Sequence, residues 1–125
     1  RLLTPIVNPL RCKMRCLDAN GAPLSLSSQV VDISVGGACL AGLPADLPLD
    51  TDTQFADCVI DLPEGGAVVA NLQLRWLADV VSRSGVPSKR AGFEFLRLPH
   101  AKSTLIQRYI TRTERERKAR DTGQL

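Results

Sequence analysis

The stretch that decides the fold reads Val31-Asp32-Ile33-Ser34-Val35-Gly36-Gly37-Ala38-Cys39-Leu40. Asp32 and Ser34 are two residues apart, and alternate residues of a strand point to the same face, so we expect both side chains on one face. The pair Gly36-Gly37 then interrupts the strand, and an apolar strand resumes at Ala38. The stretch therefore predicts two strands joined by a glycine turn, with two polar side chains just before that turn.

These residues have the chemistry of a guanine nucleotide site. The carboxylate of Asp32 can accept two hydrogen bonds from the N1–H and N2–H₂ edge of guanine, and the hydroxyl of Ser34 can donate to a phosphate. Glycines at 36 and 37 let backbone N–H groups approach an anion closely. Three fixed positions are a weak pattern, so a polar strand end followed by an ordinary Gly-Gly turn is the alternative interpretation.

Segments with a period of two flank this stretch on both sides. Apolar and basic residues alternate from Leu10 to Cys16, and Asp18-Ala19-Asn20-Gly21 is a turn signal. After Pro99 the period becomes helical, through Leu105, Ile106, Tyr109, Ile110 and Thr113. We expect strands at residues 10–16, 23–33, 38–41, 55–62, 68–80 and 89–98. The sequence thus predicts a mostly β fold, a small closed antiparallel β-barrel of about six strands with a C-terminal α-helix.

Length and charge restrict the classes of function. The chain has 125 residues, which suits one domain, and its formal net charge of +3 fits an anionic ligand. That charge is too small to indicate a nucleic-acid partner by itself. No apolar run has the length of a membrane span, so we expect no membrane insertion. Because the chain begins with Arg1 rather than Met, we expect an additional N-terminal domain to precede it.

The sequence contains few residues in patterns that suit catalysis or metal binding. The four cysteines include no C-x-x-C pair, and His100 is the only histidine. We therefore expect buried, reduced thiols, no metal site and no cofactor. There is also no nucleophile motif and no P-loop, so we do not expect an enzyme. The cysteines are Cys12, Cys16, Cys39 and Cys58.

The sequence resembles the PilZ family. Asp32-x-Ser34-x-x-Gly37 matches the family's (D/N)xSxxG motif, residues 89–95 look like its closing strand, and residues 105–110 look like the tail of its flagellar-brake branch. The resemblance covers nearly the whole chain. It implies an extended lead-in that clamps the ligand (1–9), a PilZ β-barrel (10–98), and a C-terminal helix with a charged tail (99–125).

The resemblance also implies the ligand, cyclic di-GMP. Its site would comprise Arg1, Asp32, Ser34, Gly36 and Gly37. The family has a second motif, RxxxR, and Arg1 stands where its second arginine would fall, so the first would lie upstream of residue 1. The run from Arg11 to Arg15 has the same spacing, but it alternates with apolar residues on one strand. We interpret that run as a solvated strand face.

By the same resemblance, the output would be regulation of flagellar motility in the cytoplasm, at the flagellar basal body, through motor switch or stator proteins. The alternative is a PilZ-like protein-interaction module that binds no nucleotide, and an arginine upstream of Arg1 would argue against it. A barrel that binds single-stranded nucleic acid needs exposed aromatic rings. Trp76 could stack on a base, but it alternates in step with Leu74 and Ala78, which favours a core position. DNA and RNA are therefore not expected partners.

Overall fold

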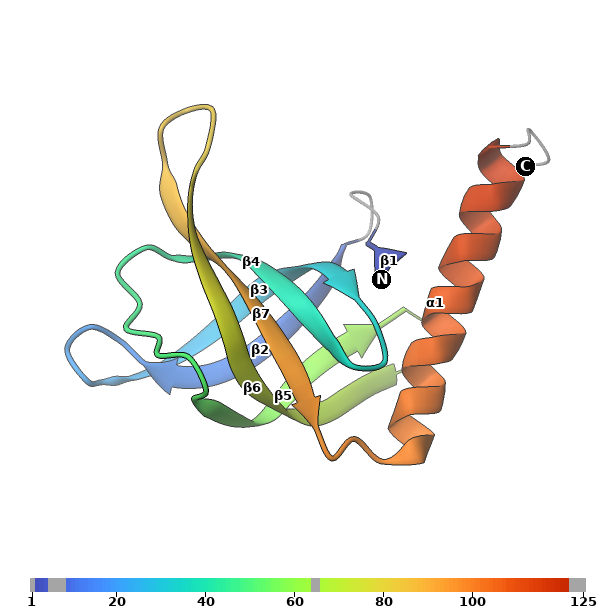
Figure 1. Cartoon of the computed structure of the whole chain (residues 1–125), viewed down its shortest axis with the longest axis horizontal. Helices are drawn as coiled ribbons and strands as arrows, with labels where there is room; N and C mark the ends of the chain where they lie inside the picture. Colours follow the sequence, from blue (N-terminus) through green and yellow to red (C-terminus); the bar gives the residue numbers. More distant parts are fainter. Residues whose placement is uncertain (1, 5–8, 64–65, 122–125) are drawn as a thin grey trace.

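The computed structural model describes residues 2–4, 9–63 and 66–121, and most of them lie in strands (Figure 1). The strands form one sheet in the order β1-β3-β2-β5-β6-β7-β4, with antiparallel pairing throughout. A further pairing of β3 with β4 closes the sheet into a barrel, and β1 adds to β3 outside that ring. The elements are β1 (Leu2–Leu3), β2 (Leu10–Leu17), β3 (Pro23–Ile33), β4 (Gly37–Pro44), β5 (Gln54–Leu62), β6 (Gly66–Val81), β7 (Pro87–Leu96) and α1 (His100–Asp121). The predicted fold class, a closed antiparallel barrel with a C-terminal helix, is confirmed.

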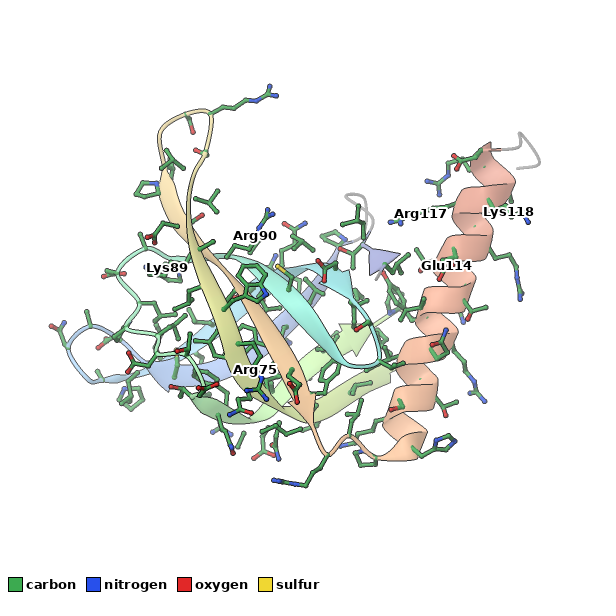
Figure 2. All side chains as sticks on the ribbon, viewed as in Figure 1. Arg75, Lys89, Arg90, Glu114, Arg117 and Lys118 are labelled. Carbon is green, nitrogen blue, oxygen red and sulfur yellow. The ribbon has the colours of Figure 1, made fainter. Side chains whose placement is uncertain are left out.

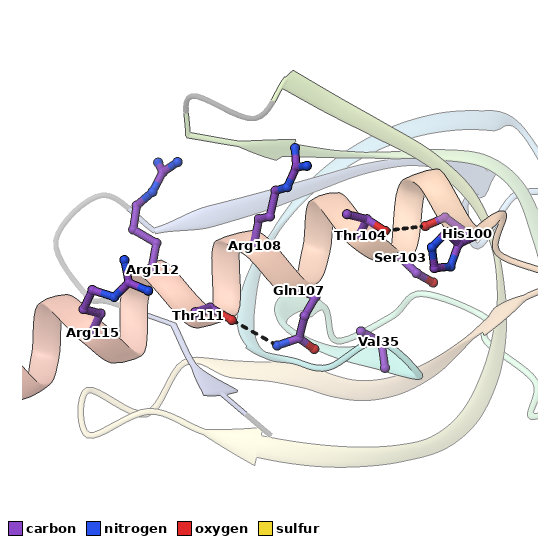
Figure 3. Close-up of a pocket in the computed structure, with 9 residues that line it drawn as sticks. All are labelled: Val35, His100, Ser103, Thr104, Gln107, Arg108, Thr111, Arg112 and Arg115. Carbon is purple, nitrogen blue, oxygen red and sulfur yellow. Dashed lines mark hydrogen bonds between the residues drawn. The ribbon is translucent and has the colours of Figure 1, made fainter.

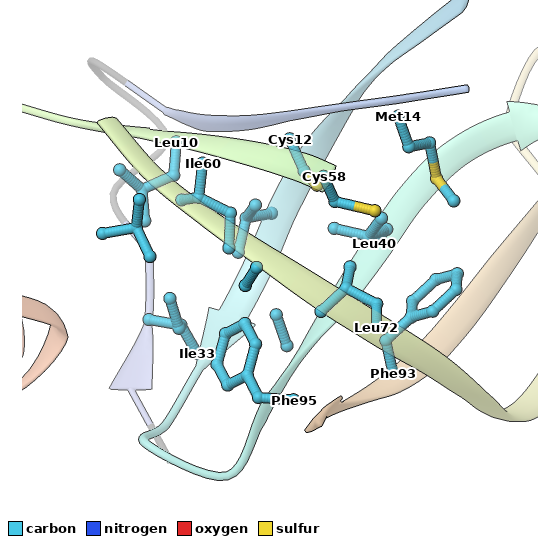
Figure 4. Packing of buried hydrophobic residues seen from close by; sticks show 14 of the residues in the cluster. Leu10, Cys12, Met14, Ile33, Leu40, Cys58, Ile60, Leu72, Phe93 and Phe95 are labelled. Carbon is cyan, nitrogen blue, oxygen red and sulfur yellow. The ribbon is translucent and has the colours of Figure 1, made fainter. Parts of the chain in front are cut away.

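The interior of the barrel is filled by the alternating apolar residues of its strands (Figure 4). In β2, Leu10, Cys12 and Met14 are buried, whereas the basic residues between them are exposed. Phe55 and Phe93 meet edge to face with their ring centroids 5.9 Å apart. Full burial of one such side chain contributes about 1.5–3 kcal/mol, so this shared core is the main stabilising element of the barrel.

Bulges curve the strands where the barrel turns. Register shifts occur between Val30 and Asp32, between Leu40 and Leu43, between Phe55 and Cys58, and between Leu74 and Trp76. A bulge places two residues of one strand opposite one residue of its partner, which bends the strand and reverses the inside–outside alternation beyond it.

The bulge in β6 overturns one prediction. Leu74 is fully buried, but Trp76 is 43% exposed although the two residues have the same parity. The prediction of a core position for Trp76 was therefore wrong, because Arg75 is the extra residue of the bulge and Trp76 turns outward.

Several element boundaries differ from the sequence prediction, most by one or two residues, as in β7, which was expected at 89–98 and spans Pro87–Leu96. The strand expected at 38–41 continues to Pro44, because Gly42 adopts a φ of 74° and lets the chain bend without ending the pairing. Helix α1 continues through the charged segment after Thr111. It is helical as far as Asp121, and Lys118 and Arg120 in the last turn interact favourably with the helix dipole.

Helix α1 lies along one side of the barrel, near β1 (Figure 1). Its buried residues are Ile106, Tyr109, Ile110 and Thr113. Lys102 donates a hydrogen bond to the carbonyl oxygen of Val69. No helix in the described ranges is long and apolar enough to cross a membrane.

The lead-in strand is held from two sides. Its Leu2 and Leu3 pair with Ile33 and Asp32 of β3. From the other side, Arg117 of α1 donates a hydrogen bond to the carbonyl oxygen of Leu3 (Figure 2). The segment that precedes the barrel is thus tied both to the strand that carries Asp32 and to the C-terminal helix.

The cysteines are free, and three of the four are buried: Cys12, Cys39 and Cys58. Burial raises the pKa of Cys12 from its ordinary value of 9.0 to about 12, and it raises the pKa of Cys58 to about 11. Raised folded-state pKa values stabilise the fold fully below the ordinary thiol pKa, and this contribution is lost as the pH rises toward the folded values. Cys16 is partly exposed.

We predict that Ellman's reagent modifies one thiol readily in the folded protein at mildly alkaline pH. Cys16 is the reactive group, because the other three thiols are buried, and the raised pKa values of Cys12 and Cys58 also keep those two protonated. Denaturant should release all four thiols. Cys16→Ser should remove the rapid phase, and rapid modification of several thiols in the native protein would contradict the buried arrangement.

Candidate functional site

The turn between β3 and β4 is fixed by a compact set of hydrogen bonds. The N–H of Ser34 donates to the carbonyl oxygen of Gly37 at 2.9 Å, and the N–H of Gly36 donates to Ser34 Oγ at 3.2 Å. The carbonyl oxygen of Gly36 accepts from the N–H of Phe95 in β7 at 2.9 Å. The turn is thus anchored to its own strands and to β7.

The two glycines of the turn have different roles. A Cβ at Gly37 would lie 2.1 Å from the carbonyl oxygen of Phe93, a distance that no folded backbone tolerates. Gly37 is therefore required for the close approach of β4 to β7. A Cβ at Gly36 would meet only Ser34 Oγ, at 3.7 Å. The space above Gly36 is open to a ligand.

Asp32 lies where β3 has neighbours on both sides. Its backbone pairs with Leu3 of the lead-in strand and with Cys39 of β4. Asp32 and Ser34 are both half-buried, and the fully buried Ile33 separates them. The structure therefore brings Asp32, Ser34 and the two glycines together at one strand end. Arg1, the remaining residue of the predicted site, lies outside the described residues.

An open depression of about 490 Å³ adjoins the turn. It is lined by Ser34, Gly36, Arg75, Trp76, Gly92, Phe93, Glu94 and Phe95. Trp76 forms part of its wall, and its indole lies directly over Gly92: a Cβ there would be 1.9 Å from Trp76 Nε1. The depression combines the face of an aromatic ring with the polar end of β3.

The sequence favoured a core position for Trp76 over the alternative of stacking on a base, and the exposed ring in this depression reverses that order. A signal was present in Gly92, because a glycine inside a strand often marks a bulge or the close approach of another group. The strand opposite Gly92 has a bulge between Leu74 and Trp76, and the indole of Trp76 approaches the glycine closely.

Arg75 forms a charged rim beside this depression (Figure 2). Its Nε donates to Glu94 Oε2 at 2.9 Å, and its Nη1 donates to Asp52 Oδ1 at 3.1 Å. The hydrogen bond to Glu94 raises the pKa of Arg75, which stays charged. All three side chains are exposed, so these pairs contribute little stability and mainly order the rim.

The RxxxR-like run on β2 lies elsewhere. Arg11 donates to Ser27 Oγ at 2.8 Å and to the carbonyl oxygen of Ser27 at 2.6 Å, and both Arg11 and Arg15 are exposed. Neither lines the depression. Within the described part of the chain, no group of three or more His, Cys, Asp or Glu side chains is arranged to hold a metal ion.

The chemistry of the site suits a flat, anionic ligand. An indole face can stack on a heteroaromatic ring, a carboxylate can accept hydrogen bonds from the edge of that ring, and a hydroxyl can reach a phosphate. A family model for the PilZ domain matches residues 7–112. The chain belongs to the PilZ family.

The relatives of this PilZ domain include flagellar brake proteins. The flagellar brake protein YcgR of Azoarcus sp. (strain BH72) is 38% identical over 125 residues, which cover 100% of this chain and 48% of the relative. The YcgR protein of Thauera aminoaromatica is 32% identical over 125 residues, with the same coverage of both chains. The chain spans about half the length of the curated relatives it matches.

Solved structures share the fold of this PilZ domain. The PilZ domain of YcgR from Escherichia coli, solved with c-di-GMP, has a TM-score of 0.75 at 21% identity, covering 99% of this chain and 95% of that chain. The c-di-GMP complex of K. pneumonia MrkH has a TM-score of 0.76 at 18% identity, covering 95% and 52% of the two chains. The barrel and its C-terminal helix are therefore an arrangement already known in this family.

We predict that Gly37→Ala destabilises this PilZ domain by about 1–3 kcal/mol, because the added methyl group meets the Phe93 carbonyl oxygen. Gly36→Ala is the matched control and should change the free energy of unfolding by less than about 0.5 kcal/mol. Urea denaturation measures both. Equal destabilisation by the two substitutions would contradict the assignment of separate roles.

Proposed function

We propose that this PilZ domain binds cyclic di-GMP at the Asp32–Gly37 turn and the adjoining depression, and that the bound state regulates flagellar motility through a protein partner. One observation carries the proposal: Ser34 and Gly36 of the (D/N)xSxxG motif share an open depression with the exposed ring of Trp76. Relatives named as flagellar brakes, and related structures solved with c-di-GMP, support it.

In this proposal each residue has a distinct role. Asp32 accepts hydrogen bonds from the N1–H and N2–H₂ groups of one guanine. The hydroxyl of Ser34 accepts from the Gly36 N–H, but as a donor it makes only a long contact of 3.5 Å with the Gly37 carbonyl oxygen, so its proton can turn toward a phosphate. The open space above Gly36 admits the ligand, while Gly37 keeps the turn against β7. Trp76 stacks on a base, since every base offers a π face.

The lead-in segment supplies the remaining contacts. Arg1, with an arginine upstream of it, would bind phosphate and guanine as a planar guanidinium group can. The pairing of Leu3 with Asp32 places the lead-in strand next to the motif. Because Leu2 and Leu3 already pair with β3, ligand binding would act through Arg1 and reorient whatever precedes it.

The chain spans about half of each relative considered above. We propose that the flagellar output requires further segments beside this domain. We propose motor switch or stator proteins on the cytoplasmic side of the flagellar basal body as its partners.

Calorimetric titration of cyclic di-GMP tests the site. We predict saturable binding by the protein that includes the residues upstream of Arg1. Asp32→Ala and Ser34→Ala should each weaken binding about tenfold to a hundredfold, the effect of losing a hydrogen bond to a charged group. Asp61→Ala and Ser25→Ala are the matched controls. They remove an aspartate and a serine side chain from exposed positions of β5 and β3 and should leave the affinity unchanged. No binding by the folded protein would leave the protein-interaction module as the function.

Trp76 is the only tryptophan of the chain, so its fluorescence reports on the depression directly. We predict that cyclic di-GMP quenches this emission saturably, because the indole stacks on a guanine base. The dissociation constant from the quenching should agree with the one from calorimetry. Trp76→Leu should weaken binding about tenfold, as expected for the loss of one stacked base. Calorimetric binding without any change in emission would show that the bases lie elsewhere.

A further inference from the structure

Glu94 is a second carboxylate beside the turn that follows Asp32. Its backbone pairs directly with Gly37 of that turn, and the residue lines the same depression as Ser34 and Trp76. Its side chain is 49% exposed, so the carboxylate is accessible to a ligand. The depression therefore contains a hydrogen-bond acceptor that the proposed roles above leave unused.

The spacing of the two carboxylates suits a ligand with two bases. Asp32 lies in β3 and Glu94 in β7, with β4 between them, so their backbones are roughly 10 Å apart across the sheet. Cyclic di-GMP carries two guanines, and Asp32 accepts from the edge of only one of them in the proposed function. The N1–H and N2–H₂ groups of the other guanine need a second acceptor.

Arg75 holds the Glu94 carboxylate toward β6, away from the turn. Its Nε donates to Glu94 Oε2 at 2.9 Å, and its Nη1 donates to Asp52 Oδ1 at 3.1 Å. These bonds use two of the five N–H groups of an arginine, and one of the about four lone-pair sites of the Glu94 carboxylate. The pair therefore presents donors next to acceptors, and the arginine neutralises a carboxylate that would otherwise repel an anionic ligand.

A second depression, of about 590 Å³, lies along α1 (Figure 3). Val35 of the β3–β4 turn flanks it, and its other described lining residues belong to α1, including Arg108, Arg112 and Arg115. No Asp or Glu is among the described residues that line it, so it offers no carboxylate to the N1–H and N2–H₂ groups of a guanine. The depression beside Glu94 is the one that suits a base edge.

We propose that Glu94 and Arg75 together bind the edge of the second guanine of cyclic di-GMP, the base that stacks on Trp76. The O6 atom of guanine is an acceptor, and it lies next to the N1–H and N2–H₂ donors. Arg75 donates to O6 while Glu94 accepts from N1–H and N2–H₂, so the order of donors and acceptors in the pair matches the base. This inference rests on the proposed function, because it assigns further residues to the same nucleotide site.

Calorimetric titration with two nucleotides tests the pair, using the protein that includes the residues upstream of Arg1. Cyclic di-IMP differs from cyclic di-GMP only in lacking the N2 amino groups. E94Q should weaken cyclic di-GMP binding about tenfold, the effect of losing a hydrogen bond to a charged group. It should also narrow the preference for cyclic di-GMP over cyclic di-IMP, because glutamine keeps one acceptor for N1–H and loses the acceptor for N2–H₂. R75Q should weaken both nucleotides, since both carry O6.

The sign of the E94Q effect separates a contact from a change of charge. E94Q removes a negative charge near an anionic ligand, so a Glu94 that makes no contact would leave the affinity unchanged or raise it. Either of these results, or equal weakening of both nucleotides, overturns the inference. D79N is the matched control, because Asp79 pairs with Lys89 at 2.8 Å across the same two strands, outside the depression. It should bind cyclic di-GMP within about twofold of the original chain.

The outcomes also separate this inference from the proposed function. Failure of the original chain to bind cyclic di-GMP overturns both. Binding that D32A and S34A weaken but E94Q does not would retain the proposed function and overturn the role of Glu94. Thermal melting followed by circular dichroism confirms that each variant is folded, as expected for substitutions of exposed side chains.

Discussion

Barrel closure depends on the backbone contact between Gly37 and Phe93, where β4 comes close enough to β7 that no side chain fits between them. The same turn joins β4 to β3, whose pairing closes the ring, and its Gly36 carbonyl oxygen accepts the N–H of Phe95. The motif residues Asp32 and Ser34 stand directly before this turn. The constraint that closes the barrel therefore also fixes the positions of the candidate ligand groups, and the site has little freedom to rearrange.

Much of the fold could be predicted from the sequence because period-two alternation is a local property. The alternation from Leu10 to Cys16 and the end of β3 at Ile33 follow from neighbouring residues alone, and both agree with the structure. The placement of the candidate site was predictable to the extent that its residues lie in one short segment, whereas their binding role stays a prediction. Asp32, Ser34, Gly36 and Gly37 are indeed together. Arg1 lies outside the described residues and stays a prediction.

The rest could not be predicted, because it depends on pairing between distant strands. The bulge that turns Trp76 outward exists only where β6 pairs with β7. Simple alternation of faces along β6 alone therefore assigns Trp76 to the wrong face. The tie between Leu3 and Arg117 is likewise invisible in the sequence, since it joins segments at opposite ends of the chain. The surface on the two sides of the β3–β4 turn also differs in character. The depression beside Ser34 and Gly36 contains aromatic residues, whereas the one beside Val35 contains arginines of α1.

The packing of Trp76 on Gly92 has a consequence for how this sequence can diverge. With tryptophan at position 76, any Cβ at position 92 would collide with the indole ring, so the glycine is fixed as long as the ring stays in place. Once the ring is replaced by a short side chain, that restriction disappears and position 92 can vary. The two positions should therefore change in a fixed order during evolution, with the tryptophan lost first and the glycine free to drift only afterwards.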